Sequence, residues 1–136
     1  MCNDLVKCGC VPCKSKILKF PNEQILPKEL QKHFIRGYFD GDGCICRCEG
    51  LVKRKDRNNA LYHYKRYFLT FAGTKDVLDK ICIFLHDKTK YIKNSEFNYQ
   101  LKFGGTKKIQ NLMSMFYKDA NIYLDRKYEK YTELIN

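Results

Sequence analysis

Two carboxylates separated by one residue close the segment His33–Gly43, which reads HFIRGYFDGDG. Asp40 and Asp42 alternate with Gly41 and Gly43, so carboxylates and flexible backbone carbonyls can converge on one point. Hard oxygen donors of this kind suit Mg²⁺. The residues that follow lack the oxygen ligands of an EF-hand loop. The alternative is an ordinary turn, because Asp-Gly pairs are common turn formers.

The element that must position these carboxylates is an amphipathic helix. Pro27 suits the first turn of a helix. Apolar residues then recur at helical spacing, namely Leu30, Phe34, Ile35, Tyr38 and Phe39. The pattern predicts a helix from about Lys28 to Asp40 that Gly41 and Gly43 end.

An internal repeat organises the middle of the chain. Tyr67–Lys75 (YFLTFAGTK) recurs as Tyr99–Lys107 (YQLKFGGTK), and each copy predicts a strand that runs into an amphipathic helix. Thr74 and Thr106 are predicted to cap these two helices. Alternate strand residues are predicted to be buried, namely Tyr67, Leu69, Phe71, Tyr99, Leu101 and Phe103.

The remaining elements complete one α+β domain. Strands are predicted at Cys44–Cys48 and near Lys90–Lys93, a basic and partly flexible hairpin at Leu51–Arg66, and a last helix near Tyr123–Ile135 with Leu124, Tyr128, Tyr131 and Ile135 on its apolar side. The order is αββαββα, with a four-stranded antiparallel sheet and helices on one face. This domain spans residues 27–136, and residues 1–26 form an N-terminal extension.

Composition restricts the partners. The 136 residues include 26 Lys and Arg against 15 Asp and Glu, a net charge of +11, which favours a polyanion such as nucleic acid. Met1 is followed by polar residues without an apolar signal segment, so the eight cysteines are expected to be reduced thiols. No stretch approaches the ~20 apolar residues of a membrane span. We expect a soluble, cytoplasmic protein with no membrane partner.

The face of the sheet that the helices leave free is the candidate DNA-binding surface. Polar and basic side chains on a twisted sheet can read base edges and phosphates in the major groove. The alternative is a solvated sheet face. The candidate residues of this face and of the basic hairpin are Lys53, Arg54, Lys55, Arg57, Lys65, Arg66, Phe68, Thr70, Asn98, Gln100 and Lys102.

The segment Ile35–Gly43 resembles the signature of the LAGLIDADG homing endonucleases. Gly37, Asp40, Asp42 and Gly43 match the signature outright, and Arg36 is the polar departure from it. The resemblance extends to Gly9–Pro21, which precedes the motif, and to Tyr123–Tyr128, which opens the last helix. The order of elements and the internal repeat also fit this family.

The resemblance implies a metal-dependent enzyme that hydrolyses phosphodiester bonds in double-stranded DNA, encoded by a bacterial, phage or organellar gene. It assigns the metal, Mg²⁺ or Mn²⁺, to Asp42 and the carbonyl of Gly41. Asp40 is expected to order the helix junction and is a further candidate ligand. The candidate basic catalytic residues are Lys127, then Arg126, with Lys75 placed to organise water. The alternative for Lys127 is an ordinary solvated lysine.

The resemblance also implies a homodimer, because the motif occurs once and cutting both DNA strands requires two acidic clusters. In this family the motif helices of two domains pack closely together. Gly37 would permit that approach despite a cost of ~1 kcal/mol relative to Ala inside a helix. Ile35, Gly37 and Tyr38 are therefore the expected interface residues.

The main alternative is a catalytically inactive relative that binds DNA or RNA, either maturase-like or degenerate. Zinc could stabilise such a protein through its two cysteine clusters, Cys8, Cys10 and Cys13 with Cys44, Cys46 and Cys48. The thiols at 44, 46 and 48 fall on a strand expected to touch DNA, and hydrogen-bonding groups are sparse there. In this alternative the extension at residues 1–26 is the remnant of a longer upstream segment.

Overall fold

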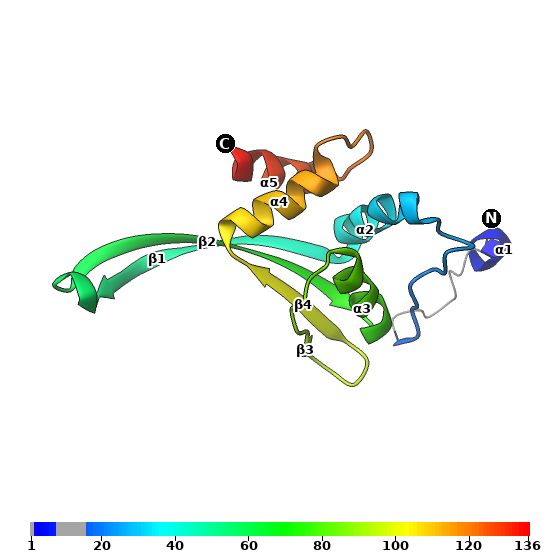
Figure 1. The fold of residues 1–136 in the computed structure, drawn as a ribbon, viewed down its shortest axis with the longest axis horizontal. Coiled ribbons are helices and arrows are strands. Elements are labelled where there is room, and N and C mark those ends of the chain that lie inside the picture. Colours follow the sequence, from blue (N-terminus) through cyan, green and yellow to red (C-terminus); the bar gives the residue numbers. More distant parts are fainter. Residues whose placement is uncertain (1, 8–15) are drawn as a thin grey trace.

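A four-stranded antiparallel sheet carries helices on one face in the computed structural model, which describes residues 2–7 and 16–136 (Figure 1). From residue 28 onward the chain follows the predicted order αββαββα, and one more helix ends it. The elements are α1 (Cys2–Lys7), α2 (Lys28–Asp42), β1 (Gly43–Arg54), a 3-10 turn η2 (Lys55–Arg57), β2 (Ala60–Gly73), α3 (Lys75–Phe84), β3 (Ile92–Lys93), β4 (Tyr99–Gly104), α4 (Thr106–Tyr117) and α5 (Asp125–Ile135).

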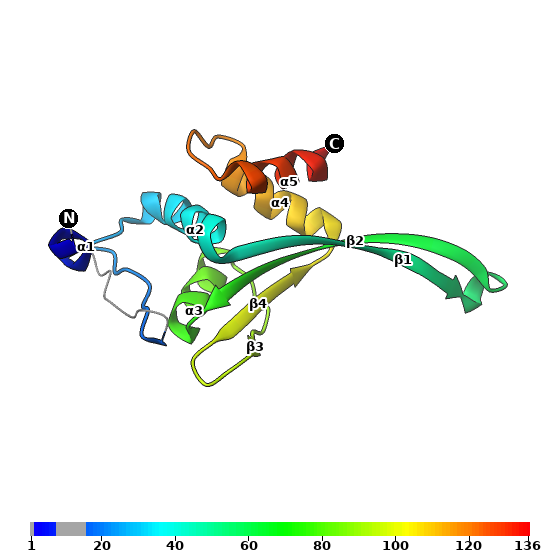
Figure 2. The same ribbon diagram turned by 180° about the vertical axis from the view of Figure 1, so that it is seen from behind.

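The strand order is β1-β2-β4-β3, so the two repeated strands, β2 and β4, are central neighbours. β1 pairs with β2 from Gly43↔Phe71 to Arg54↔Ala60. The outer half of this ribbon projects beyond the helices (Figures 1 and 2). The predicted strand at 44–48 was therefore too short, and the hairpin expected to be partly flexible is regular, because backbone pairing continues to the turn.

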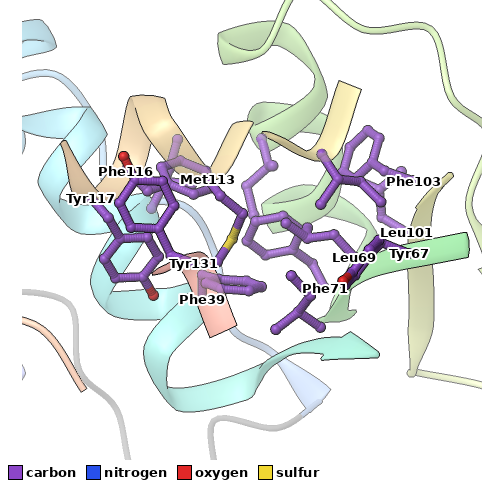
Figure 3. Packing of buried hydrophobic residues seen from close by; sticks show 14 of the residues in the cluster. Phe39, Tyr67, Leu69, Phe71, Leu101, Phe103, Met113, Phe116, Tyr117 and Tyr131 are labelled. Carbon is purple, nitrogen blue, oxygen red and sulfur yellow. The ribbon is translucent and has the colours of Figure 1, made fainter. Parts of the chain in front are cut away.

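The core lies between the helices and the inner face of the sheet. The alternate residues predicted to be buried are buried, except that Tyr99 is half-buried at the sheet edge. Phe39 of α2 sits at the centre of an aromatic cluster, with ring centroids 5.4 Å from Phe71 and 6.0 Å from Phe116 (Figure 3). Such aromatic contacts stabilise a core beyond their buried area alone. The helix that carries the two carboxylates is thus anchored on the sheet.

The two repeated threonines have different roles. Thr74 precedes α3, its Oγ1 accepts a hydrogen bond from the backbone N–H of Val77, and it donates to the carbonyl of Leu18 at 2.6 Å. Thr106 instead lies inside the first turn of α4, and Gly105 is the capping residue with φ of 97° and no side-chain cap. The predicted cap at Thr106 is wrong because α4 begins one repeat position earlier than α3, so Thr106 lies inside the helix and the preceding Gly105 takes the capping position.

The last helix is rotated relative to the prediction. It begins at Asp125 and buries Lys127, Tyr131 and Leu134. Leu124 and Ile135, both expected on the apolar face, are 39% and 48% exposed. Tyr131 stacks on Tyr117, with centroids 5.7 Å apart, and this contact with α4 selects the buried face.

The segment at residues 16–26, predicted to belong to an extension, packs against the domain. Leu18 and Phe20 contact the core cluster, and the backbone N–H of Phe20 donates to Asp76 Oδ2 at 2.8 Å. The resemblance noted for residues 9–15 lies outside the described residues. Within the described ranges, no helix is long and apolar enough to cross a membrane.

The two threonines provide a matched test of capping. Thr74→Val removes the cap of α3 and the bond to Leu18, so we expect it to lower the free energy of unfolding by about 1–2 kcal/mol. Thr106→Val removes neither, and its effect should stay within about 0.5 kcal/mol. Urea unfolding followed by circular dichroism measures both values. Equal losses in the two variants would contradict this assignment.

Candidate metal site and nucleic-acid interface

Asp42 is the last residue of α2, and its side chain is exposed. It lines a hollow of about 410 Å³ together with Lys16, Tyr38, Gly73 and Asn98. Burial and the negative charge of Asp42 raise the pKa of Tyr38 to about 12, so this phenol is neutral at ordinary pH. The carboxylate therefore faces an accessible, partly polar hollow at the end of the helix.

Asp40, two residues earlier, is committed to the fold of its own chain. The hydroxyl of Tyr117 donates to Asp40 Oδ1, and the backbone N–H of Leu124 donates to Oδ2 at 3.2 Å. Burial, and then the bond to this carboxylate, raise the pKa of Tyr117. Asp40 thus joins α2 to α4 and to the start of α5, as expected of a junction residue. Both of its oxygens accept hydrogen bonds within the domain, and its role as a further metal ligand stays a prediction.

Lys127 is a buried lysine that closes the end of α2. Its side chain is 4% exposed, and its Nζ donates to the carbonyl of Phe39 at 3.1 Å and to that of Gly43. The same Nζ lies 4.4 Å from the centroid of the Phe39 ring. Burial and the neighbouring Arg126 lower the pKa of Lys127. The alternative of a solvated lysine is wrong, and Lys127 holds the backbone that presents Asp42.

The other two basic candidates lie in different places. Arg126 is exposed and lines a shallow hollow of about 200 Å³ with Gly43, Cys44 and Lys130. Lys75 begins α3 and lines a separate hollow beside Tyr99, where a side-chain hydrogen bond with Tyr91 raises the pKa of Lys75.

The cation that does line the hollow of Asp42 is Lys16. Sequence reasoning did not select it, because it lies in the extension and no local pattern connects it to α2. Its Nζ lies 5.3 Å from the centroid of the Phe97 ring, which belongs to the turn between β3 and β4.

The outer face of α2 is open along its small residues. A side chain added at Gly37 or Gly41 would meet no atom within 4 Å. Tyr38 is turned toward the sheet and donates to the carbonyl of Ala72 at 2.7 Å. Ile35 is 0% exposed and belongs to the core, so its prediction as an interface residue is corrected: its side chain is not available to a partner.

Arg36, the polar departure in the motif, is also explained by the fold. It is buried, and its Nη1 donates to the carbonyl of Phe116 near the end of α4 at 3.5 Å. A long stem that crosses apolar surface while its charged head reaches a carbonyl is the usual solution for a buried arginine. The polar residue is therefore compatible with the helix pattern.

The described residues contain no preformed cluster of metal-binding side chains. Across residues 2–7 and 16–136, no group of three or more His, Cys, Asp or Glu side chains could hold a metal ion. The carboxylate of Asp42 and the carbonyl of the exposed Gly41 are hard donors that fit Mg²⁺, which takes six oxygen ligands. Cys44, Cys46 and Cys48 therefore do not form a zinc site by themselves, and the cluster at 8–13 lies outside the described residues.

The strand register divides the predicted DNA-binding residues between surfaces. Even-numbered strand residues share the open face, because Cys48 pairs with Arg66 and Thr70 pairs with both Cys44 and Lys102. The predicted residues on this face are Arg54, Arg66, Phe68, Thr70, Gln100 and Lys102. Lys53 and Lys65 lie on the opposite face, Lys55 and Arg57 in the turn η2, and Asn98 in the turn before β4.

Aromatic rings hold the cations of the open face. Arg54 lies 4.7 Å from the ring centroid of Tyr62, and Arg66 lies 5.2 Å from that of Tyr64. Lys102 lies 4.2 Å from the ring of Phe68. Sequence reasoning missed the two tyrosines, although they alternate with the cations on the same face. Among the described strand residues that point to this face, none is acidic. The surface is therefore electrostatically suited to a polyanion.

Comparison with solved structures identifies the fold. The chain is similar to the homing endonuclease I-CvuI in complex with the I-CreI target, at 17% identity and a TM-score of 0.55, over 84% of this chain and 69% of that one. It is also similar to the homing endonuclease I-TnaI, at 17% identity and a TM-score of 0.55, over 76% of this chain and 71% of that one. A third similar structure is the LAGLIDADG homing endonuclease I-LtrWI bound to target DNA, at 15% identity and a TM-score of 0.57, over 79% of this chain and 36% of that one. No family model and no curated protein matches the sequence.

The contacts of Lys127 provide a test of its role. Lys127→Met keeps the buried stem and removes the hydrogen bonds from Nζ to the carbonyls of Phe39 and Gly43, so we expect the free energy of unfolding to fall by about 2 kcal/mol. Lys130→Met, one turn along on the exposed side, should change it by no more than about 0.5 kcal/mol. Thermal and urea unfolding measure both. If Lys127→Met is as stable as Lys130→Met, Lys127 does not anchor α2.

Proposed function

We propose that this chain, which has the fold of the LAGLIDADG homing endonucleases, is one subunit of a site-specific endonuclease that hydrolyses double-stranded DNA with Mg²⁺ or Mn²⁺. The observation that carries the proposal is the contrast between two neighbouring carboxylates. Both oxygens of Asp40 accept hydrogen bonds inside the domain, whereas Asp42 ends the helix exposed. A helix end held so firmly, with its final carboxylate left free, suits a metal-binding position.

The surface next to Asp42 supports DNA as the substrate. The open face begins at β1, which follows Asp42 directly, and it carries Arg54, Arg66 and Lys102. The chain has a net charge of +11. Phosphate contacts from such cations supply much of the affinity for duplex DNA. I-CvuI and I-LtrWI are described in complexes with target DNA, and I-CvuI in the presence of magnesium.

The residues of this chain would divide the chemistry as follows. Asp42 and the carbonyl of Gly41 would hold the metal, which supplies activation of water and neutralises charge on the phosphate oxygens. Lys127 is a positioning residue, because its ammonium is occupied by carbonyls at the end of α2. Arg126 is exposed in the hollow beside Gly43. In this proposal Arg126, rather than the buried Lys127, is the cation that contacts the scissile phosphate.

The outer side of helix α2, where Gly37 and Gly41 lie, supports a homodimer. His33, Gly37 and Gly41 succeed one another at helical spacing, and a hollow of about 480 Å³ beside them is lined by Ile122 and Tyr123. Ile122 is 82% exposed. Small residues on a helix let a second helix approach closely, and a two-fold arrangement would bring a second Asp42 and Gly41 to the first. The target would then be pseudo-palindromic.

The role of Asp42 is tested by cleavage of a plasmid library that carries random inserts. Wild-type protein should linearise a subset of plasmids with Mg²⁺ or Mn²⁺ and none with EDTA. Asp42→Asn removes the ligand charge and should slow cleavage of the selected plasmid at least about 100-fold while binding persists. Asp119→Asn, in the exposed loop after α4, is the control and should cut normally. Binding without cleavage by the wild type under both metals would favour the inactive relative.

The dimer is tested by Gly37→Leu. No atom of the protomer lies within 4 Å of the added Cβ, so the protomer should fold, and loss of a helical glycine should even stabilise it by about 0.5–1 kcal/mol. The added side chain should block helix–helix approach and abolish cleavage. Sedimentation velocity should show a dimer for the wild type and a monomer for the variant. A wild-type monomer, or a dimeric variant that still cuts, would contradict this arrangement.

A further inference from the structure

Three thiols form a row on the open face where the chain leaves Asp42. Cys44, Cys46 and Cys48 are exposed, and the intervening Ile45 is buried in the core. The row therefore follows the edge strand β1 outward from the carboxylate. Hydrogen-bonding side chains would be expected on a DNA-reading strand, so this composition requires its own explanation.

The neighbouring strand makes the row part of an apolar strip. Phe68 pairs with Cys46 on one side and with Gly104 on the other. The Phe68 ring lies next to Gly104, where an added Cβ would be 3.5 Å from it, an ordinary contact distance. The Nζ of Lys102 lies 4.2 Å from the centroid of the same ring. The strip is thus bordered by cations and contains none between the thiols.

The central thiol of the row, Cys46, is a neutral group. Burial, then the neighbouring Cys48 and Cys44, raise the pKa of Cys46, while Lys102 opposes them. A protonated thiol is a weak donor and a weak acceptor and behaves as a small hydrophobic group. It therefore cannot distinguish bases by strong hydrogen bonds, but it can pack against an apolar feature of a base edge.

The major groove presents one such apolar feature, the C5 methyl group of thymine. A strand advances about 3.3–3.4 Å per residue and DNA about 3.4 Å per base along each strand, so side chains on one face meet roughly every second base. The thiols start two residues after Asp42. They would consequently meet the base pairs nearest the phosphates that Asp42 acts on. Arg66 lies level with Cys48 at the outer end of the row, and Arg54 would meet pairs farther out.

We infer that Cys44, Cys46 and Cys48, together with Phe68, form an apolar strip that selects thymine by its C5 methyl group in the base pairs nearest the cleaved phosphates. This inference rests on the proposed function, since it requires the open face to lie in the major groove of duplex DNA. Metal binding by the row is the competing explanation, and among the described residues no cluster of three or more His, Cys, Asp or Glu side chains, the row included, could hold a metal ion.

The test compares the wild type with two triple variants at positions 44, 46 and 48, one with Ser and one with Ala at all three. Each protein first selects its preferred duplexes from a random-sequence duplex library in Ca²⁺. The duplex selected by the wild type is then resynthesised with deoxyuridine in place of thymine at single positions, which removes only the C5 methyl group. Fluorescence anisotropy measures the dissociation constants, and thermal unfolding confirms that the exposed substitutions leave the domain folded.

We expect the wild type to lose about fourfold in affinity for each contacted methyl that is removed. The alanine variant should keep this sensitivity, because a methyl side chain preserves the apolar contact. The serine variant should lose most of this sensitivity and keep only the part that Phe68 supplies, because a hydroxyl gains nothing from the methyl. Equal binding of both duplexes by the wild type, or undiminished sensitivity in the serine variant, would overturn the inference while DNA binding stands. If the wild type selects no duplex, the proposed function itself fails.

Discussion

The end of α2 is the point on which the rest of the structure depends. Here the ammonium of Lys127 donates to the carbonyl of Phe39, in the last turn of α2, and to the carbonyl of Gly43, the residue that follows the helix. Asp40 binds Tyr117 and the backbone of Leu124 at the same junction. These contacts draw α4 and α5 onto the helix that precedes the sheet. Asp42, by contrast, is exposed at the end of α2, immediately before β1 begins.

The sheet has two faces with different tasks. Odd-numbered strand residues such as Leu69, Phe71 and Leu101 are fully buried and join the helices to the strands. Even-numbered residues are released from packing, so their identity is constrained by what they meet outside the domain. The apolar strip of thiols near Asp42 and the stacked pairs such as Arg66 with Tyr64 divide that outer face into two chemically distinct parts.

The low identity to the solved homing endonucleases, 15–17% for those compared, is consistent with the physical demands of this fold. Cores tolerate extensive substitution when volume and hydrophobic pattern are kept. The fold requires a helix stripe, two helix-backed hairpins and a filled interior, and many sequences meet these conditions. The aromatic cluster around Phe39 is the way this chain fills the space between α2, the sheet and α4.

Periodicity in the sequence determined the order of elements, the buried strand residues and the placement of the acidic pair at a helix end. Those features depend on neighbours within a few residues, so the sequence alone specifies them. Only the tertiary structure decided that Asp40 accepts hydrogen bonds from Tyr117 and Leu124 and that Lys127 is buried rather than solvated. It also decided that Lys53 and Lys65 lie on the opposite face of the sheet from the other strand cations. The partners of Asp40 and Lys127 lie some 80 positions away along the chain. No local pattern reports such contacts, because they arise when α4 and α5 fold back onto α2.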